Sequence, residues 1–115
     1  MPRRNRSLIA QFQSGILPLY VETRRYVNVP LDQRFCINCN LNVVEDEFHL
    51  LCVCPLYENL RQEMFNSIEN HDNDFRNLDI FDKFIYISNR SQKYLGIFLH
   101  KAMNLRQQNM SIGIL

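Results

Sequence analysis

The chain has 115 residues, of which 46% are hydrophobic and 22% are charged, with three glycines and four prolines. This size and composition are ordinary for one folded domain that buries its own apolar core. No segment contains the roughly 20 apolar residues that a membrane-spanning helix needs, so we expect no membrane association. The formal net charge of +1 indicates no particular class of partner by itself.

Residues 1–34 are predicted to form a basic helix followed by an extended connection. The helix is expected between Arg6 and Ser14, with Gly15 as its stop and with inward-facing residues at helical spacing: Leu8, Ile9 and Phe12. Polar residues interrupt its apolar run and no small-residue cleavage site follows, so the segment does not predict a secretory signal. We therefore expect an intracellular protein, in the nucleus or the cytoplasm.

The segment from Ile16 to Phe35 is expected to be extended, because Pro18 and Pro30 punctuate it. We expect it to carry four apolar residues across the core: Leu17, Leu19, Tyr20 and Val21.

The cysteines carry the sharpest signal in the sequence. All four lie between Cys36 and Cys54, and Cys36-x2-Cys39 is followed after nine residues by His49 and after four more by Cys54. Two thiolates separated by two residues on a tight turn can face one metal ion. A histidine and a cysteine from a following helix can then complete the tetrahedron that Zn²⁺ prefers. The pattern predicts one structural zinc ion.

Disulfide, redox and purely apolar roles for the cysteines fit this pattern less well. A disulfide framework would spread its cysteines along a secreted chain. A thioredoxin-like redox pair would follow a strand, which residues 32–35 do not supply. RING and LIM modules need about eight ligands, and a purely apolar role would not explain the x2 spacing beside a histidine.

The fourth ligand is either Cys52 or Cys54. The run from Asn42 to Glu45 resembles a capping box and predicts a short helix through about Leu51. On that helix Cys52 would share a face with His49. Cys54 lies past the helix end and before a proline, which favours extended backbone that folds back. We favour Cys54 as the ligand and Cys52 as a core thiol.

Residues 55–110 are predicted to be helical. Pro55 opens one helix at its first position, Asp79 caps another, and a last helix runs from about Ser91 to Gln108. Their expected core residues are Leu56, Leu60, Met64, Ile68, Phe81, Phe84, Ile85, Ile87, Tyr94, Leu95, Phe98, Leu99, Ala102 and Leu105. The two remaining histidines, His71 and His100, are expected to face solvent or to pack without a functional role.

The predicted fold is therefore mainly α: residues 1–115 form a small helical domain around a single CCHC zinc knuckle at residues 35–54. Charge is distributed unevenly along it. Residues 1–34 carry a net charge of +4, residues 35–82 of −8 and residues 83–115 of +5. Basic ends of this kind can mark a polyanion partner, although solvated helix faces of uneven sign give the same pattern.

Three stretches together resemble a known family. They are Arg34-Phe35-Cys36-Ile37-Asn38-Cys39, Val44-Glu45-Asp46-Glu47-Phe48-His49-Leu50-Leu51, and Cys54-Pro55-Leu56-Tyr57 with Leu60-Arg61. The run from Glu45 to Leu56 is the most specific, because an acidic turn, a ligand histidine and Cys-Pro follow in order. The chain strongly resembles, over nearly its whole length, the zinc-binding domain at the C-terminal end of reverse transcriptases from non-LTR (LINE-type) retrotransposons.

This resemblance implies that Cys36, Cys39, His49 and Cys54 bind zinc. In that family the domain follows the polymerase and is thought to help hold template RNA or target DNA during target-primed reverse transcription. It thus implies RNA or DNA as the partner, with the polymerase domain as a second candidate partner. The basic residues that we expect to contact phosphates are Arg3, Arg4, Arg6, Arg24, Arg25, Arg34, Lys101 and Arg106.

Polymerase chemistry needs paired aspartates that hold divalent metals, and the only adjacent acids of this chain are residues 45–47. We therefore expect no enzyme activity from the chain alone, although full-length relatives would be RNA-directed DNA polymerases. The expected function is that of a nucleic-acid-binding accessory domain, a remnant or fragment of such a reverse transcriptase. The alternative is a zinc-stabilised protein-interaction scaffold that binds no nucleic acid. Convergence of the two basic ends on one face would favour the first function.

Overall fold

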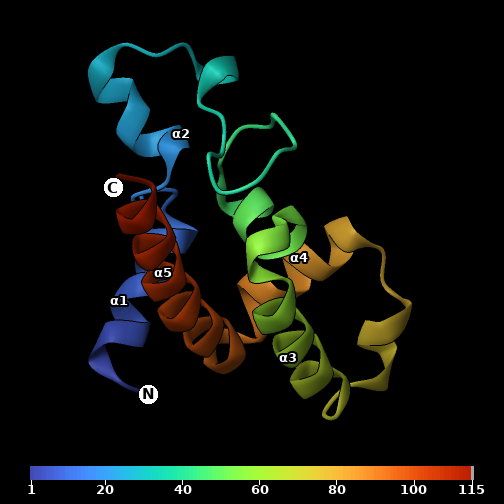
Figure 1. The fold of residues 1–115 in the computed structure, drawn as a ribbon. Coiled ribbons are helices and arrows are strands. Elements are labelled where there is room, and N and C mark those ends of the chain that lie inside the picture. Colours follow the sequence, from blue (N-terminus) through green and yellow to red (C-terminus); the bar gives the residue numbers. More distant parts are fainter. Residues whose placement is uncertain (115) are drawn as a thin grey trace.

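The computed structural model describes residues 1–114, and for Tyr26 and residues 111–114 it describes the backbone alone. Its α-helices are α1 (Arg3–Gln13), α2 (Tyr20–Thr23), α3 (Glu58–Glu69), α4 (Ile80–Arg90) and α5 (Gln92–Ile114), as Figure 1 shows. The 3-10 helices η1 (Arg24–Val27), η2 (Leu31–Gln33), η4 (Pro55–Tyr57) and η5 (Asn73–Asn77) and a π-helix, η3 (His49–Val53), complete the helical elements of the described residues. The fold is mainly helical, as predicted.

Helix α5 is the centre of the fold and packs against α1, α3 and α4 (Figure 1). Its buried residues recur at helical spacing along one stripe: Leu95, Phe98, Leu99 and Ala102. On the α1 side the two helices meet at Gly96. A Cβ added there would lie 3.1 Å from Asn5 Cβ and 3.2 Å from Ile9 Cδ1. The absence of a side chain at Gly96 therefore lets α1 lie close against α5.

The first helix confirms the predicted inward face, because Leu8, Ile9 and Phe12 are buried. It begins at Arg3, three residues before the predicted start, so its first turn carries the N-terminal arginines. Gly15 follows the helix with a φ of +70°, a left-handed conformation that glycine adopts without steric cost. The predicted stop is therefore confirmed.

The prediction of an extended connection over residues 16–35 is wrong in its middle part. The helices α2, η1 and η2 lie in it. Proline fixes a φ that suits the first turn of a helix, so Pro30 precedes a helical turn instead of preventing one. Of the four apolar residues expected in the core, Leu17, Leu19 and Tyr20 are buried, whereas Val21 is half-buried.

Helix α4 confirms the Asp79 cap, since the side chain of Asp79 accepts a hydrogen bond from the Asp82 N–H at 2.8 Å. Two of its predicted core residues are wrong: Phe81 is 65% exposed and Ile85 is 56% exposed. Apolar residues occur on more than one face of this helix, and the fold buries only the face that carries Ile87.

Among the other predicted core residues, five are half-buried: Leu56, Leu60, Phe84, Tyr94 and Leu105. No helix in the described part of the chain is long and apolar enough to cross a membrane.

Candidate metal centre

The structure brings the four predicted ligands together. One candidate donor atom from each of Cys36, Cys39, His49 and Cys54 lies within 4.8 Å of the others. The Sγ atoms of Cys36 and Cys54 are 4.0 Å apart, and Cys39 Sγ is 3.5 Å from His49 Nε2. Cys36, His49 and Cys54 are buried, and Cys39 is half-buried. Three sulfurs and one imidazole nitrogen in this arrangement could bind one metal ion.

The first two ligands lie in a narrow loop between residues 34 and 45. Phe35 and Val44 form an isolated antiparallel bridge, with the Cys36 N–H donating to the Val43 carbonyl at 2.9 Å. Asn42 closes the loop with a φ of +56°, a conformation that asparagine tolerates better than most residues. Within the loop the Asn38 N–H points at Cys36 Sγ at 3.4 Å. The backbone thus orients this sulfur before any metal binds.

The other two predicted ligands lie at the two ends of the π-helix η3: His49 is its first residue, and Cys54 follows its last. The helical segment begins at Glu47, and Asp46 caps it by accepting the His49 N–H at 2.8 Å. The predicted cap at Asn42 is therefore wrong, because Asn42 belongs to the loop turn. The Cys54 N–H donates to the His49 carbonyl at 2.8 Å, an i to i+5 bond that closes one wide π-turn. The turn leaves Cys54 extended, with a ψ of 124°, and its Sγ lies within 4.8 Å of the other three candidate donor atoms.

Cys52 lies outside the cluster. It is buried on η3, and burial raises the pKa of its thiol to about 11. Its sulfur is not among the candidate donor atoms that lie within 4.8 Å of one another, whereas that of Cys54 is. The structure therefore agrees with the preference for Cys54 over Cys52.

Within the cluster one hydrogen bond joins the sulfurs of Cys36 and Cys54, and either sulfur can be its donor. Their mutual hydrogen bond, together with burial, raises the pKa of Cys36 to about 12, and the same bond lowers the pKa of Cys54. A cysteine ligand must lose its proton before its sulfur binds a metal ion. Metal binding by thiolates releases such protons, so metal affinity falls as the pH falls.

A buried carboxylate supports the first half of the cluster. Glu45 is 1% exposed, and its Oε2 lies 3.9 Å from Cys36 Sγ and accepts the side-chain amide of Asn38 at 3.2 Å. Its Oε1 accepts the Tyr20 N–H at 2.7 Å. The guanidinium of Arg106 donates to both carboxylate oxygens, at 2.6 and 2.8 Å. Glu45 therefore joins the metal-ligand loop to α2 and α5.

A buried arginine supports the second half. Arg61 is 3% exposed and donates from Nε to the Leu51 carbonyl at 2.8 Å and from Nη2 to the Cys54 carbonyl at 2.7 Å. It also pairs with Glu58 one turn earlier on α3. The backbone around the last two ligands is thus tied to α3.

Neither Glu45 nor Arg61 was predicted to support the site. No local signal separates Glu45 from its acidic neighbours, and Arg61 looks like any polar residue on an amphipathic helix. Both are recognisable only from the groups that they meet in the folded chain.

The structure contradicts the predicted phosphate contact of Arg106. Its guanidinium is buried and donates from Nε and Nη2 to the Glu45 carboxylate. Arg34 also uses two of its donor groups within the protein, since its Nη1 donates to the Val21 carbonyl at 2.7 Å and its Nε to the Val29 carbonyl at 3.0 Å. Arg34 is half-buried and keeps its charge near the surface.

The remaining predicted basic residues lie at two ends of the molecule. Arg3, Arg4 and Arg6 are exposed on α1, and Lys101 is exposed on α5. At the other end Arg24 lies with its guanidinium 4.1 Å from the centre of the Tyr20 ring. Its neighbour Arg25 is exposed and pairs with Glu22 at 3.1 Å.

Comparisons of the chain with models of protein families, with curated proteins and with solved structures found no match.

Proposed function

We propose that this chain is a zinc-stabilised accessory domain that binds nucleic acid, of the type found at the C-terminal end of non-LTR retrotransposon reverse transcriptases. The observation that carries this proposal is the contact of α1, which bears Arg3, Arg4 and Arg6, with α5, which bears Lys101. Arg4 Nη2 on α1 donates to Asn104 Oδ1 on α5 at 3.2 Å. Lys101 lies three residues before Asn104 and so occupies the same side of α5.

The donor set supports zinc as the metal. Tetrahedral coordination with Zn–S near 2.3 Å and Zn–N near 2.0–2.1 Å places neighbouring donor atoms about 3.6–3.8 Å apart. The two donor distances of 4.0 and 3.5 Å bracket that spacing. Three thiolates and an imidazole are a soft, closed set, which suits structural Zn²⁺ better than Mg²⁺ or Ca²⁺. Bound zinc would hold the loop against η3 and leave no open position for catalysis.

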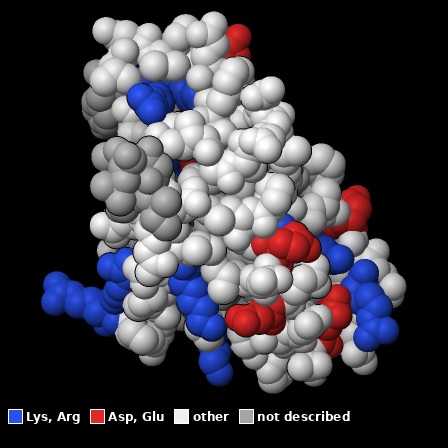
Figure 2. All heavy atoms as spheres, viewed as in Figure 1, with Lys and Arg blue, Asp and Glu red and all other residues white. Residues whose placement is uncertain are grey.

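The surface formed by Arg3, Arg4, Arg6 and Lys101 is called here the α1–α5 face. Figure 2 shows basic side chains gathered over α1 and the adjoining part of α5, whereas acidic side chains lie over α3. Arg3 and Arg6 are exposed and carry no ion pair with a described residue. Exposed cations from two adjoining helices can contact successive phosphates without reading a base sequence.

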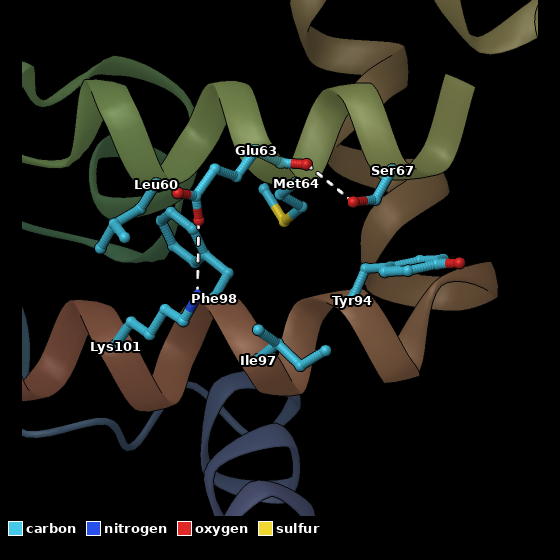
Figure 3. A pocket seen from close by; sticks show the side chains of 8 residues that line it. All are labelled: Leu60, Glu63, Met64, Ser67, Tyr94, Ile97, Phe98 and Lys101. Atoms are coloured by element: carbon cyan, nitrogen blue, oxygen red, sulfur yellow. Dashed lines mark hydrogen bonds and ion pairs between the residues drawn. The ribbon is translucent and has the colours of Figure 1, made fainter. Parts of the chain in front are cut away.

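One acidic residue borders this face. In Figure 3, Lys101 and Glu63 reach toward each other from α5 and α3 across a hollow of about 140 Å³, with 3.4 Å between ammonium and carboxylate. Both side chains are more than half exposed. An ion pair as exposed as this contributes little stabilising free energy in water, so the Lys101 ammonium can move from Glu63 to a phosphate when one approaches.

The proposed role is to hold template RNA or target DNA for a polymerase, without catalysis by the chain itself. Zinc-loaded protein should bind fluorescent RNA hairpins and DNA duplexes with a Kd on the order of micromolar at low salt, as non-specific binders do. The slope of log Kd against log salt then counts the phosphates contacted. The same protein should extend no primer on any template.

The test variant is Arg3→Gln with Arg6→Gln, and the matched control is Arg76→Gln with Arg90→Gln. Both variants remove two exposed arginines, but Arg76 and Arg90 lie on the η5 and α4 side. The test variant should weaken binding to all substrates alike and flatten the salt slope by about two units. The control should change both quantities much less.

A second function is favoured by one other surface. Phe81 and Ile85 form an exposed apolar strip on α4, and Phe81 stacks on Phe48 with ring centres 5.2 Å apart. Such a strip suits contact with another protein. Folded, zinc-loaded protein that binds no nucleic acid at low salt would favour a protein-interaction scaffold and overturn the proposed function.

A further inference from the structure

A groove beside the metal-ligand loop carries aromatic, apolar and basic side chains together. It has a volume of about 280 Å³ and is lined by Tyr20, Arg24, Val29, Gln33, Arg34, Phe35 and Ile37. Its lining residues belong to the segment from α2 to the metal-ligand loop, and α2 lies at the end of the molecule away from the N-terminus (Figure 1). We call it the knuckle groove. It is separate from the α1–α5 face.

The apolar side chains of this groove are open to solvent. Phe35 is 41% exposed and Ile37 is 59% exposed. Within the described side chains no other aromatic ring packs on Phe35. An exposed phenyl ring beside a second apolar side chain offers a platform for a planar apolar group.

The charged side chains that line the groove are positive. Arg24 and Arg34 line it, and no acidic side chain is among its described lining residues. Arg24 is held over the Tyr20 ring at 4.1 Å, and Arg34 by two carbonyls at 2.7 and 3.0 Å. Since these guanidinium groups are already positioned, an anion that binds between them costs little side-chain entropy.

A nucleotide combines the two chemistries that this groove provides. Its base has a flat π face for stacking, and its phosphate is an anion for arginine. The volume lies just below the range of about 300–1,000 Å³ of small-molecule sites, which suits one base better than a larger ligand. In a duplex both faces of each base are already covered, so only an unstacked base could enter.

We propose that the knuckle groove binds one unstacked base of a single-stranded nucleic acid, with the base on Phe35 and a neighbouring phosphate at Arg24. This inference rests on the proposed function and extends it. The α1–α5 face would bind phosphates of any strand, whereas the knuckle groove would give preference to single strands. The amide of Gln33 could then contact the edge of the base.

The test uses the zinc-loaded chain of 115 residues and two probes, a single-stranded oligonucleotide that contains 2-aminopurine and a duplex of the same sequence. Stacking quenches the fluorescence of 2-aminopurine, so binding of the single strand should reduce its emission. Phe35→Leu should weaken single-strand binding by about tenfold or more, remove the quenching, and leave duplex affinity unchanged. The matched control is Phe81→Leu, which removes a more exposed aromatic ring on α4 and should change neither.

Because Phe35 adjoins a metal ligand, the zinc content and helical circular dichroism of Phe35→Leu are measured first. If this variant does not fold, Arg24→Gln takes its place and should flatten the single-strand salt slope by about one unit.

Equal effects of Phe35→Leu and Phe81→Leu, or unquenched single-strand binding by the unaltered chain, would overturn this inference while the proposed function stands. Loss of self-association in Phe35→Leu without any change in nucleic-acid binding would also overturn it and assign the groove to a second copy. No binding of either probe would overturn the proposed function itself.

Discussion

The carboxylate of Glu45 and the guanidinium of Arg106 form a buried ion pair between residues 61 positions apart in the chain. The side chains of Glu45 and Arg106 are only 1% and 9% exposed. Because Glu45 also lies 3.9 Å from Cys36 Sγ, this pair connects the metal-ligand loop directly to α5. The geometry of the loop and the position of the central helix are thus linked through one carboxylate.

We predict that Arg106→Met destabilises the zinc-loaded protein by about 3–5 kcal/mol, because it leaves a carboxylate buried without its counter-charge. The double variant Glu45→Gln with Arg106→Met should lose less than the sum of the two single variants, since removal of both charges leaves none unpaired. Urea denaturation followed by circular dichroism measures all three. The control is Arg25→Met, whose exposed pair with Glu22 should be worth less than about 1 kcal/mol. Additive losses would show that the two residues do not act together.

The metal ligands give the second prediction. Purified protein should contain one zinc per chain, and chelation should lower its Tm sharply, since binding contributes about 10–16 kcal/mol in comparable small sites. Each ligand variant should lose the metal: Cys36→Ser, Cys39→Ser, His49→Ala and Cys54→Ser. Cys52→Ser is the matched control, because Cys52 is a buried thiol of the same segment outside the cluster. Metal analysis and thermal denaturation test this set, and zinc retained by Cys54→Ser but lost by Cys52→Ser would reverse the ligand assignment.

Arg61 gives the third prediction. Arg61→Met leaves the carbonyls of Leu51 and Cys54 without the donors that reach them at 2.8 and 2.7 Å. Because these buried carbonyls are left unpaired, the free energy of unfolding should fall by about 2–5 kcal/mol in all. Because both carbonyls belong to the segment that positions His49 and Cys54, zinc affinity should also fall by about 10- to 100-fold.

Competition with a chromophoric chelator measures this affinity. Arg76→Met, which replaces an exposed arginine on η5, is the control and should bind zinc as the unaltered chain does. If Arg61→Met is destabilised but binds zinc with unchanged affinity, Arg61 stabilises the fold and does not position the metal ligands.

Glu63 gives the fourth prediction. Glu63→Gln removes the carboxylate 3.4 Å from Lys101, so the ammonium should be freer to contact phosphate. Binding of nucleic acid should strengthen a few-fold and the salt slope should steepen by up to about one unit. The control is Glu69→Gln on the same helix, which changes the net charge equally. An equal gain in both variants would mean that net charge, and not Lys101, sets the affinity.

Several features were predictable because they depend on residues close in sequence. The four ligands span only residues 36–54, so local turn geometry and spacing suffice to predict that they meet. The Asp79 cap and the Gly15 stop are likewise decided by the backbone needs of a single helix end. For such features the sequence carries nearly all of the information.

Other features depend on which surfaces the fold happens to cover. Asn42 and Asp46 are both good caps, and the loop conformation decides that Asp46 is used. Phe81 and Ile85 have the same apolar character as Ile87, yet only the face with Ile87 meets the core. Apolar pattern alone cannot choose among several apolar faces of one helix.

Residue types and their spacing were thus enough to predict the four clustered residues and the mainly helical fold. The uneven distribution of charge along the chain is read from the sequence directly. Which charges remain at the surface depends on how the helices pack. Arg106 is the clearest case: it has the appearance of one more cation of a basic helix, but it is buried against Glu45. A buried ion pair needs a partner at a defined distance and angle, and for Arg106 that partner arrives from 61 residues away only when α5 packs against the metal-ligand loop.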